Sequence, residues 1–165
     1  MKTLLILRHA KAQADAPNGD RKRTLTKRGR RDAAAMADHI AAKLGRPDAI
    51  VTSDATRARE TADAVAAATG FDAPLTIEPD VYAADLDTLV AVVRGLPDAA
   101  DSVVLVGHNP GFEELTAALA GVDEDEVRLP TAGLARLELD VARWNDAAMG
   151  AGRLQDIETP GGLAR

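Results

Sequence analysis

Short apolar runs alternate along the chain with longer segments in which apolar residues recur every three or four positions. Runs typical of strands buried on both faces occupy residues 4–7, 49–51 and 103–106, and a brief strand is expected over 75–77. Helical spacing, bounded by capping residues, glycine or proline, occupies residues 26–44, 54–69, 86–96 and 109–120. We expect Ser53 or Asp54 to cap the second of these helices and Asn109, before Pro110, to cap the fourth. This alternation predicts a mainly parallel sheet covered by helices on both faces.

The pattern changes after Gly133, where apolar and polar residues alternate with a period of two. Such alternation over 134–140 is typical of an edge or antiparallel strand, and a further weak strand is expected around 154–157. Neither a repeat nor a low-complexity linker interrupts the 165 residues. We therefore expect one α/β domain over residues 1–165, a three-layer α/β/α sandwich whose mainly parallel central sheet has an antiparallel edge strand.

Composition excludes several classes of function. The chain has no cysteine, which rules out disulfides, thiolate zinc sites and cysteine catalysis. Aromatic residues make up 2% and the net charge is −6, so neither a base-stacking platform nor a general polyanion-binding surface is expected. No apolar stretch approaches the roughly 18 residues of a membrane span, and the run at 4–7 is too short for a secretory signal. We expect a cytoplasmic protein that contacts neither nucleic acid nor membrane.

A dense run of cations nevertheless stands between positions 21 and 31: Arg21, Lys22, Arg23, Lys27, Arg28, Arg30 and Arg31. A run of like charge usually forms a solvated helix face. Lys27 and Arg28, however, fall in the first turn of a helix that Thr26 is expected to cap, where the helix dipole disfavours cations. An anionic substrate or partner close by would account for this placement.

Three polar clusters directly follow predicted parallel strands: Arg8-His9, Thr52-Ser53-Asp54 with Arg57, and Gly107-His108-Asn109. Ligands of open parallel sheets bind at the carboxyl ends of the strands, so these clusters should share one rim. Two histidines and two arginines on that rim suit a phosphoryl group. Guanidinium forks match phosphate oxygens, and imidazole can act as a nucleophile.

Three of these four side chains also have a simpler explanation, whereas Arg8, a guanidinium directly after a buried strand, needs an anionic partner. His9 and His108 could bind a metal, but no His-x-x-x-His spacing or carboxylate cluster accompanies them. Arg57 could form a salt bridge on its own helix. His39, in mid-helix between Asp38 and Ile40, is expected to be structural.

Four segments carry a resemblance to a known family: Leu5-Ile6-Leu7-Arg8-His9-Ala10, Arg23-Thr24-Leu25-Thr26-Lys27-Arg28-Gly29, Ser53-Asp54-Ala55-Thr56-Arg57-Ala58-Arg59-Glu60-Thr61-Ala62 and Val106-Gly107-His108-Asn109. In this order they resemble the Arg-His-Gly signature, the Pro-Leu-Thr-x-x-Gly segment, the Ser-x-x-x-Arg-Ala-x-x-Thr-Ala segment and the second-histidine motif of the histidine phosphatase superfamily, also called phosphoglycerate mutase-like. The likeness runs from residue 3 to about residue 140. The compact length and the turn at 107–111 look like its SixA-type phosphohistidine phosphatase branch.

The resemblance implies a covalent mechanism. His9 would attack phosphorus and become phosphohistidine, while Arg8, Arg57 and His108 would hold the phosphoryl oxygens and stabilise the transition state. Water would then hydrolyse the phosphoenzyme. No metal or other cofactor is expected, because the cationic side chains supply the neutralisation that Mg²⁺ provides in kinases.

The resemblance also implies substrate contacts around this group. Arg23 matches a family arginine near the pocket mouth, and Asn109 and Ser53 are expected to contact the substrate. Ala10 stands where the signature usually has glycine, a change that matters only if the backbone there needs a positive φ.

A second departure concerns the proton donor. Mutase-like members carry a glutamate after the middle strand, whereas residues 81–87 of this chain contain none. Asp85 lies in that stretch and is a candidate proton donor, although its position at the start of a helix also suits a structural N-cap.

The missing glutamate favours one class of substrate. An alkyl phosphate expels a poor alkoxide leaving group unless an acid protonates it. Phosphohistidine expels an imidazole whose conjugate acid has a pKa of about 6.5. We therefore expect a metal-independent, monomeric phosphatase acting on phosphohistidine, in a protein domain docked by the 21–31 cations or in a small phosphoramidate. The alternatives are a phosphomonoesterase for sugar or nucleotide phosphates that uses Asp85 as acid, and a non-catalytic phosphate-binding module.

Overall fold

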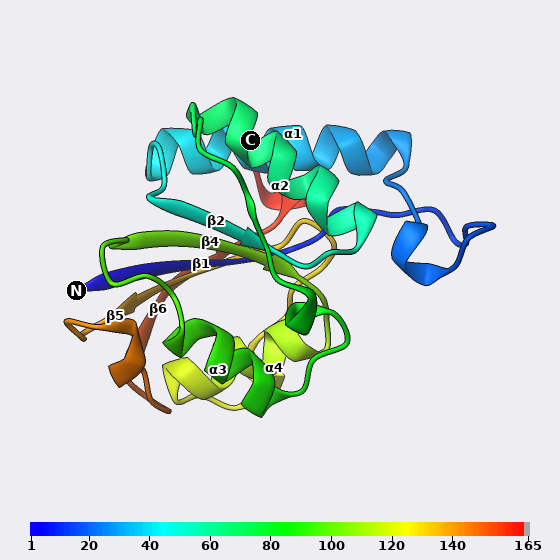
Figure 1. Ribbon diagram of the computed structural model, residues 1–165. Coiled ribbons are helices and arrows are strands. Elements are labelled where there is room, and N and C mark those ends of the chain that lie inside the picture. Colours follow the sequence, from blue (N-terminus) through cyan, green and yellow to red (C-terminus); the bar gives the residue numbers. More distant parts are fainter. Residues whose placement is uncertain (164–165) are drawn as a thin grey trace.

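A computed structural model describes residues 1–163 and contains one six-stranded sheet between two layers of helices (Figure 1). The strands are β1 (Lys2–Arg8), β2 (Ala49–Thr52), β3 (Thr76–Ile77), β4 (Ser102–Gly107), β5 (Leu134–Leu139) and β6 (Gly152–Glu158). The α-helices are α1 (Lys27–Lys43), α2 (Thr56–Thr69), α3 (Leu86–Arg94) and α4 (Gly111–Ala120). Helices α1 and α2 cover one face and α3 and α4 the other, which confirms the three-layer α/β/α sandwich.

The strand order is β3-β2-β4-β1-β5-β6, and β1, β2, β3 and β4 are parallel to their neighbours within that set. Strand β5 pairs antiparallel with β1, as its period of two predicts. It is not the edge strand, because β6 pairs antiparallel with its other side and closes the sheet there. Of the two alternatives expected for residues 134–140, β5 is thus the antiparallel one, and the weakly patterned C-terminal strand β6 forms the antiparallel edge.

The residues of β1 explain why its apolar run is unbroken. Leu4 and Ile6 point into the core beneath α3 and α4, whereas Leu5 and Leu7 belong to the core beneath α1 and α2. A strand buried on both faces has no solvent side on which to alternate polar residues. Burial on both faces also makes β1 a rigid support for whatever follows Arg8.

The helix starts agree with prediction in two cases of four. Thr26 caps α1 by accepting a hydrogen bond from the main-chain N–H of Gly29 at 2.9 Å, and Asp85 caps α3 in the same way through Thr88 at 2.9 Å. Helix α2 instead begins after Ala55 without a side-chain cap, so the prediction of Ser53 or Asp54 in that role is wrong.

Helix α4 also starts differently from the prediction. Asn109 does not cap it, because the Nδ2 of Asn109 donates to the carbonyl of Leu129 at 2.8 Å and Pro110, after a cis peptide bond, occupies the N-cap position. In both mispredicted helices the polar residue before the start is used elsewhere, close to the carboxyl ends of the strands.

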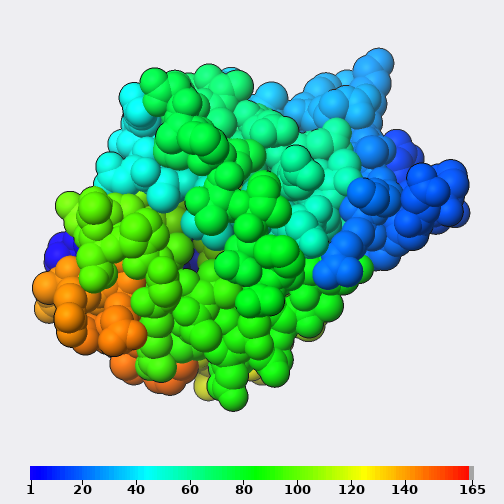
Figure 2. Space-filling view, viewed as in Figure 1, coloured from blue at the N-terminus to red at the C-terminus, as the bar shows by residue number. Residues whose placement is uncertain are grey.

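Between β1 and α1 the chain leaves the body of the molecule as a projection, residues 11–25, seen at the right of Figures 1 and 2. Its two ends are held together by an antiparallel bridge between Ala12 and Leu25 and by a hydrogen bond from Thr26 N to Lys11 O at 2.9 Å. Gly29 is required beneath this closure, since a Cβ there would lie 2.0 Å from the carbonyl oxygen of Lys11. We call residues 11–25 the projection below.

No helix in the described part of the chain is both long and apolar enough to cross a membrane.

Candidate active site

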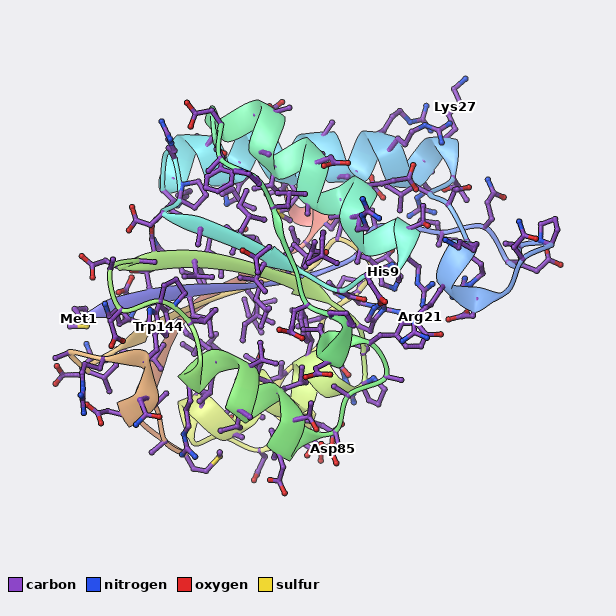
Figure 3. The ribbon with its side chains drawn as sticks, in the orientation of Figure 1. Met1, His9, Arg21, Lys27, Asp85 and Trp144 are labelled. Carbon is purple, nitrogen blue, oxygen red and sulfur yellow. The ribbon has the colours of Figure 1, made fainter. Side chains whose placement is uncertain are left out.

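A polar pocket of about 380 Å³ opens at the carboxyl ends of the parallel strands. The register of β1 and β4 sets Arg8 opposite Gly107, and the next residues, His9 and His108, are therefore neighbours with ring centroids 5.2 Å apart. In Figure 3, His9 and Arg21 lie at this end of the sheet, whereas Met1 lies at the other. The lining residues are Arg8, His9, Lys11, Ala12, Asp20, Arg23, Arg57, Tyr82, Ala83, His108, Asn109 and Thr131.

Glycine at position 107 permits this arrangement. A Cβ at Gly107 would lie 2.5 Å from the ring of Phe112 and 2.7 Å from the side chain of Val81. Close packing of β4 against these two side chains places the following His108 in the pocket wall. Ala10, by contrast, is absent from the described non-glycine residues with positive φ, so alanine fits there where the family usually has glycine.

His9 is buried, with 8% of its surface exposed, and forms the floor of the pocket. Its Nδ1 lies 2.7 Å from the carbonyl oxygen of Ala10. A carbonyl only accepts hydrogen bonds, so Nδ1 carries the ring proton and Nε2 retains a free lone pair. Burial, with the positive charges of Arg57, Arg8 and Arg23, lowers the pKa of His9 to about 4. At neutral pH the ring is therefore uncharged, the state in which a free Nε2 can act as a nucleophile.

His108 is held by a residue that does not line the pocket. Its Nε2 lies 2.8 Å from the Oγ of Ser53, which is fully buried and also accepts a hydrogen bond from Ala55 N at 3.1 Å. Burial, the neighbouring His9 and the positive charge of Arg57 lower the pKa of His108 to about 3. Ser53, expected to touch the substrate, thus lies behind His108 and acts through it.

The guanidinium groups of Arg8 and Arg57 are each held by a main-chain carbonyl. Arg8 donates from Nη1 to the carbonyl of Leu129 at 3.0 Å, and Arg57 donates from Nη1 to the carbonyl of Asp20 at 2.7 Å. In both side chains the buried Nε finds no partner among the described residues. Unpartnered buried donors are costly, so both guanidinium groups are suited to an anionic ligand that would satisfy them.

Asp20 and Tyr82 line the pocket although sequence patterns did not single them out. The Asp20 carboxylate accepts from Arg23 Nε at 2.9 Å and from Arg57 Nη2 at 3.1 Å, and it also accepts a hydrogen bond from the Tyr82 hydroxyl. The Tyr82 ring packs edge-on against His108, and Arg21 stacks on it at 4.0 Å. One signal was available: Tyr82 is the sole tyrosine of the chain and lies in the stretch that lacks the family glutamate.

The remaining predicted residues divide into two groups. Arg23, expected near the pocket mouth, and Asn109, expected to contact the substrate, both line the pocket. Asp85 is not among the lining residues; it is exposed at the start of α3, apart from His9 in Figure 3, and its carboxylate accepts from Thr88 N. The geometry gives no support to Asp85 as a proton donor.

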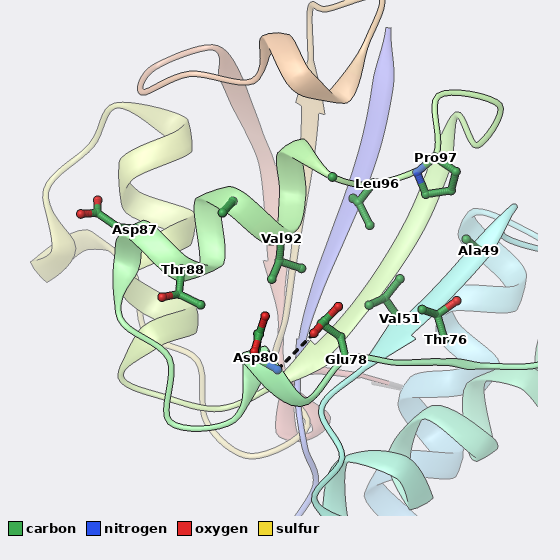
Figure 4. Close-up of a pocket in the computed structure, with 12 residues that line it drawn as sticks. Ala49, Val51, Thr76, Glu78, Asp80, Asp87, Thr88, Val92, Leu96 and Pro97 are labelled. Atoms are coloured by element: carbon green, nitrogen blue, oxygen red, sulfur yellow. Dashed lines mark hydrogen bonds between the residues drawn. The ribbon is translucent and has the colours of Figure 1, made fainter.

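A second hollow, of about 510 Å³, lies between α3 and the edge of the sheet formed by β2 and β3 (Figure 4). Its lining contains the carboxylates of Glu78, Asp80 and Asp87 but neither histidine nor arginine, so it offers no cation for a phosphoryl group. Across residues 1–163, no group of three or more histidine, cysteine or acidic side chains is arranged to hold a metal ion.

Comparison with known proteins agrees with this geometry. The model of the histidine phosphatase superfamily (branch 1) matches residues 4–85. An uncharacterised protein of Mycobacterium tuberculosis is 30% identical over 162 residues, covering 93% of this chain and 99% of the relative.

Two solved structures are similar along almost their whole length. A candidate phosphohistidine phosphatase SixA from Nakamurella multipartitia has a TM-score of 0.83 and 30% identity, covering 99% of this chain and 97% of its own. A candidate phosphohistidine phosphatase SixA from Agrobacterium tumefaciens has a TM-score of 0.80 and 32% identity, covering 96% of this chain and 98% of its own.

Proposed function

The chain belongs to the histidine phosphatase superfamily and is of its SixA type, and on that premise we propose that it hydrolyses phosphohistidine through a covalent intermediate on His9. The observation that carries this proposal is the contact between Nδ1 of His9 and the carbonyl oxygen of Ala10, 2.7 Å apart, which assigns the ring proton to Nδ1. The Nδ1–H is committed to the Ala10 carbonyl, so a neutral Nε2 is free to attack phosphorus.

The first step forms a bond between His9 Nε2 and phosphorus. The bond between phosphorus and the substrate's ring nitrogen breaks, and its electron pair stays on that nitrogen. Arg8, Arg57 and His108 hold the phosphoryl oxygens as charge redistributes among them. The orphaned Nε groups of the two arginines support this role.

The second step returns the enzyme to its starting state. Water attacks phosphorus, the bond to His9 Nε2 breaks with its electron pair returning to the ring, and inorganic phosphate leaves. The second step needs no new group at the floor of the pocket, because the same cations stabilise the same charge.

The residues that line the pocket support this substrate class. The one carboxylate among them, Asp20, is hydrogen-bonded to Tyr82, Arg23 and Arg57, and these contacts hold its pKa well below the usual range. It is ionised at neutral pH and has no proton to give to an alkoxide. An imidazole protonated on its distal nitrogen needs no such donor, so phosphohistidine is favoured over sugar phosphates.

We further propose that the substrate is a phosphorylated protein domain. The mouth of the pocket adjoins the cations of residues 21–31, among which Lys22 and Lys27 are exposed. Lys27 points away from the body of the molecule in Figure 3. An acidic protein surface would complement this patch and would account for cations in the first turn of α1.

The test is a paired hydrolysis assay with EDTA present, using a phosphohistidine peptide and a panel of sugar and nucleotide monophosphates. Wild type should hydrolyse the phosphohistidine peptide much faster than any alkyl ester, and His9→Ala should lose at least about 10³-fold in kcat. A phosphoenzyme trapped in acid-quenched wild type and missing from His9→Ala would identify the intermediate. Faster turnover of an alkyl ester would contradict the proposal.

A further inference from the structure

Asp20 is the one acidic side chain in a pocket otherwise lined by cations, histidines and uncharged groups. It comes from the projection and not from a strand end, and half of its side chain is exposed (51%). His9, at 8%, is the floor of the same pocket. Asp20 therefore stands at the mouth, on the side from which a substrate enters and toward which a leaving group departs when His9 attacks from below.

Holding Arg57 does not require the Asp20 carboxylate. The main-chain carbonyl of Asp20 already accepts from Arg57 Nη1 at 2.7 Å, and the carboxylate adds a longer contact to Nη2 at 3.1 Å. Among the described residues the carboxylate accepts hydrogen bonds from three groups, Arg23 Nε, Arg57 Nη2 and the Tyr82 hydroxyl. An ionised carboxylate has about four acceptor positions, so one remains for a further donor.

We propose that Asp20 is the specificity-determining residue of this site, and that its carboxylate accepts the distal N–H of the substrate's phosphorylated imidazole. This inference rests on the proposed function and adds the group that recognises the leaving ring. An N–H donor on the leaving group would gain a charge-assisted hydrogen bond, whereas an ester oxygen would face a negative charge.

The contact changes which protonation state reacts. When His9 Nε2 bonds to phosphorus and the P–N bond breaks, a ring already protonated on its distal nitrogen leaves as neutral imidazole, and no proton is transferred in the step. A neutral ring would leave as an anion. A nearby carboxylate favours the protonated ring, so Asp20 should extend activity toward higher pH.

Other charged or titratable groups line the same pocket, and the experiment must distinguish their effects from that of Asp20. They are Arg8, His9, Lys11, Arg23, Arg57, Tyr82 and His108. All of them are present in both wild type and Asp20→Asn. The change in activity between wild type and variant, compared on two substrates that differ in the leaving group, therefore isolates the contact between Asp20 and that group.

The experiment compares kcat/KM of wild type and Asp20→Asn on a phosphohistidine peptide and on p-nitrophenyl phosphate, whose leaving group has no N–H, from pH 5.5 to 8.5. We expect the ratio of phosphohistidine to ester activity to fall about ten- to hundredfold at pH 8, the range given by one charge-assisted hydrogen bond. The fall should be smaller at pH 5.5, where the free substrate is already protonated. Ester hydrolysis should fall less than phosphohistidine hydrolysis, because an ester leaving group donates no hydrogen bond to the carboxylate.

Asp54→Asn is the matched control. Asp54 pairs with Arg21 at 3.3 Å beside the same pocket but does not line it. The substitution Asp54→Asn therefore also removes one negative charge, but from a carboxylate that cannot contact the leaving group. The ratio should stay at its wild-type value in this variant. Thermal melts of both variants check that each is folded.

The outcomes separate this inference from the proposed function. Equal loss on both substrates in Asp20→Asn would mean that Asp20 only positions Arg57, and equal gain would mean that it only competes with phosphate; either result overturns the inference and leaves the phosphohistidine assignment intact. A wild type that prefers alkyl esters would overturn the proposed function and the inference with it.

Discussion

The Nε2 atom of His108 lies 2.8 Å from the hydroxyl oxygen of Ser53, a fully buried residue with no access to the pocket. The same hydroxyl oxygen accepts the N–H of Ala55, so its own proton is free to be donated to His108. With Nε2 accepting that proton, Nδ1 carries the hydrogen of the neutral ring and becomes the donor available to a phosphoryl oxygen.

Ser53→Ala should therefore lower catalysis while leaving the pocket lining intact. Without the hydroxyl, either nitrogen of His108 can carry the proton and the ring can rotate, so we expect kcat to fall about tenfold, the size of one lost hydrogen bond. Steady-state kinetics on a phosphohistidine peptide measure this. Ser102→Ala is the control, because Ser102 also accepts a main-chain N–H, that of Asp48, but at the opposite end of β4. An unchanged kcat in Ser53→Ala would show that Ser53 does not orient the histidine.

Replacing either anchored arginine by lysine should weaken phosphate binding. Lysine keeps the charge of Arg57 or Arg8 but loses the planar edge that carries the orphaned Nε. We expect a loss of about 10²-fold in kcat/KM and a higher inhibition constant for inorganic phosphate. Arg136→Lys provides the comparison, since Arg136 also has a buried, unpartnered Nε but pairs with Asp156 on β6. Equal effects at all three positions would mean that the loss is structural.

The two pocket histidines should make the protein less stable in mild acid. Their folded-state pKa values, about 4 for His9 and about 3 for His108, lie below the 6.5 of an unfolded histidine. Between pH 6.5 and 4.5 the unfolded chain thus binds protons that the folded chain does not, and the free energy of unfolding decreases as pH falls. We expect a loss on the order of 2 kcal/mol, below the full effect of both shifts because the pocket is open to water.

Urea titrations at pH 7.0, 6.0, 5.0 and 4.5 measure this dependence. His9→Ala combined with His108→Ala should flatten it. Inorganic phosphate should flatten it too, because a bound anion favours the charged form of each ring. A wild-type slope that the double variant retains would assign the effect to other groups.

Adding a side chain at Gly29, beside the projection, should destabilise the fold strongly. An alanine Cβ there would meet the main-chain oxygen of Lys11 at 2.0 Å, so α1 and the closure of the projection must separate. We expect Gly29→Ala to cost about 3 kcal/mol or more of stability. Gly95→Ala, whose added Cβ would make only an ordinary contact of 3.4 Å with Ala91 O, should change stability by about 0.5 kcal/mol or less. Denaturant unfolding of the two variants checks both values.

Charge reversal at Lys22 and Lys27 should affect a protein substrate and spare a small one. Both side chains are exposed and neither lines the pocket. We expect the double variant Lys22→Glu, Lys27→Glu to lower kcat/KM for a phosphorylated acidic domain about tenfold at low salt, and less as salt screens the attraction. Activity on p-nitrophenyl phosphate should not change. Parallel loss on both substrates would contradict docking through this patch.

The layers, the strand ends and the four central side chains could be predicted from the sequence because each follows from local spacing. An unbroken apolar run such as that of β1 indicates a doubly buried strand, and the residues after it fall at the ligand-binding rim whatever the rest of the chain does. The roles of Ser53 and Asn109 could not be predicted in this way. Both residue types are good helix caps, and only the tertiary contacts with His108 and Leu129 show that they are used otherwise.

Asp20 and Tyr82 could not be predicted for a different reason. They are 62 positions apart in sequence. Asp20 begins a single 3-10 turn, Asp20–Lys22, and Tyr82 follows another, Pro79–Val81, and nothing in either neighbourhood indicates that the two side chains meet. Asp85 shows the converse, since a local capping signal correctly placed it at the start of α3 and away from the chemistry. Local rules thus succeed where the backbone is regular and fail where two loops converge.

The closure of the projection has a consequence for how this enzyme could diversify. The bridge between Ala12 and Leu25 and the hydrogen bond between Lys11 and Thr26 bring the two ends of the projection together. Asp20 and Arg23 lie within the segment that these contacts close off. Arg8, His9, Arg57 and His108 lie outside this segment, on or directly after the strands and helices of the sandwich. The segment between Ala12 and Leu25 can therefore be replaced without changing the rest of the pocket. Replacing it with the corresponding segment of a relative that has a different substrate should transfer that relative's preference for a leaving group and leave the hydrolysis step itself unaltered.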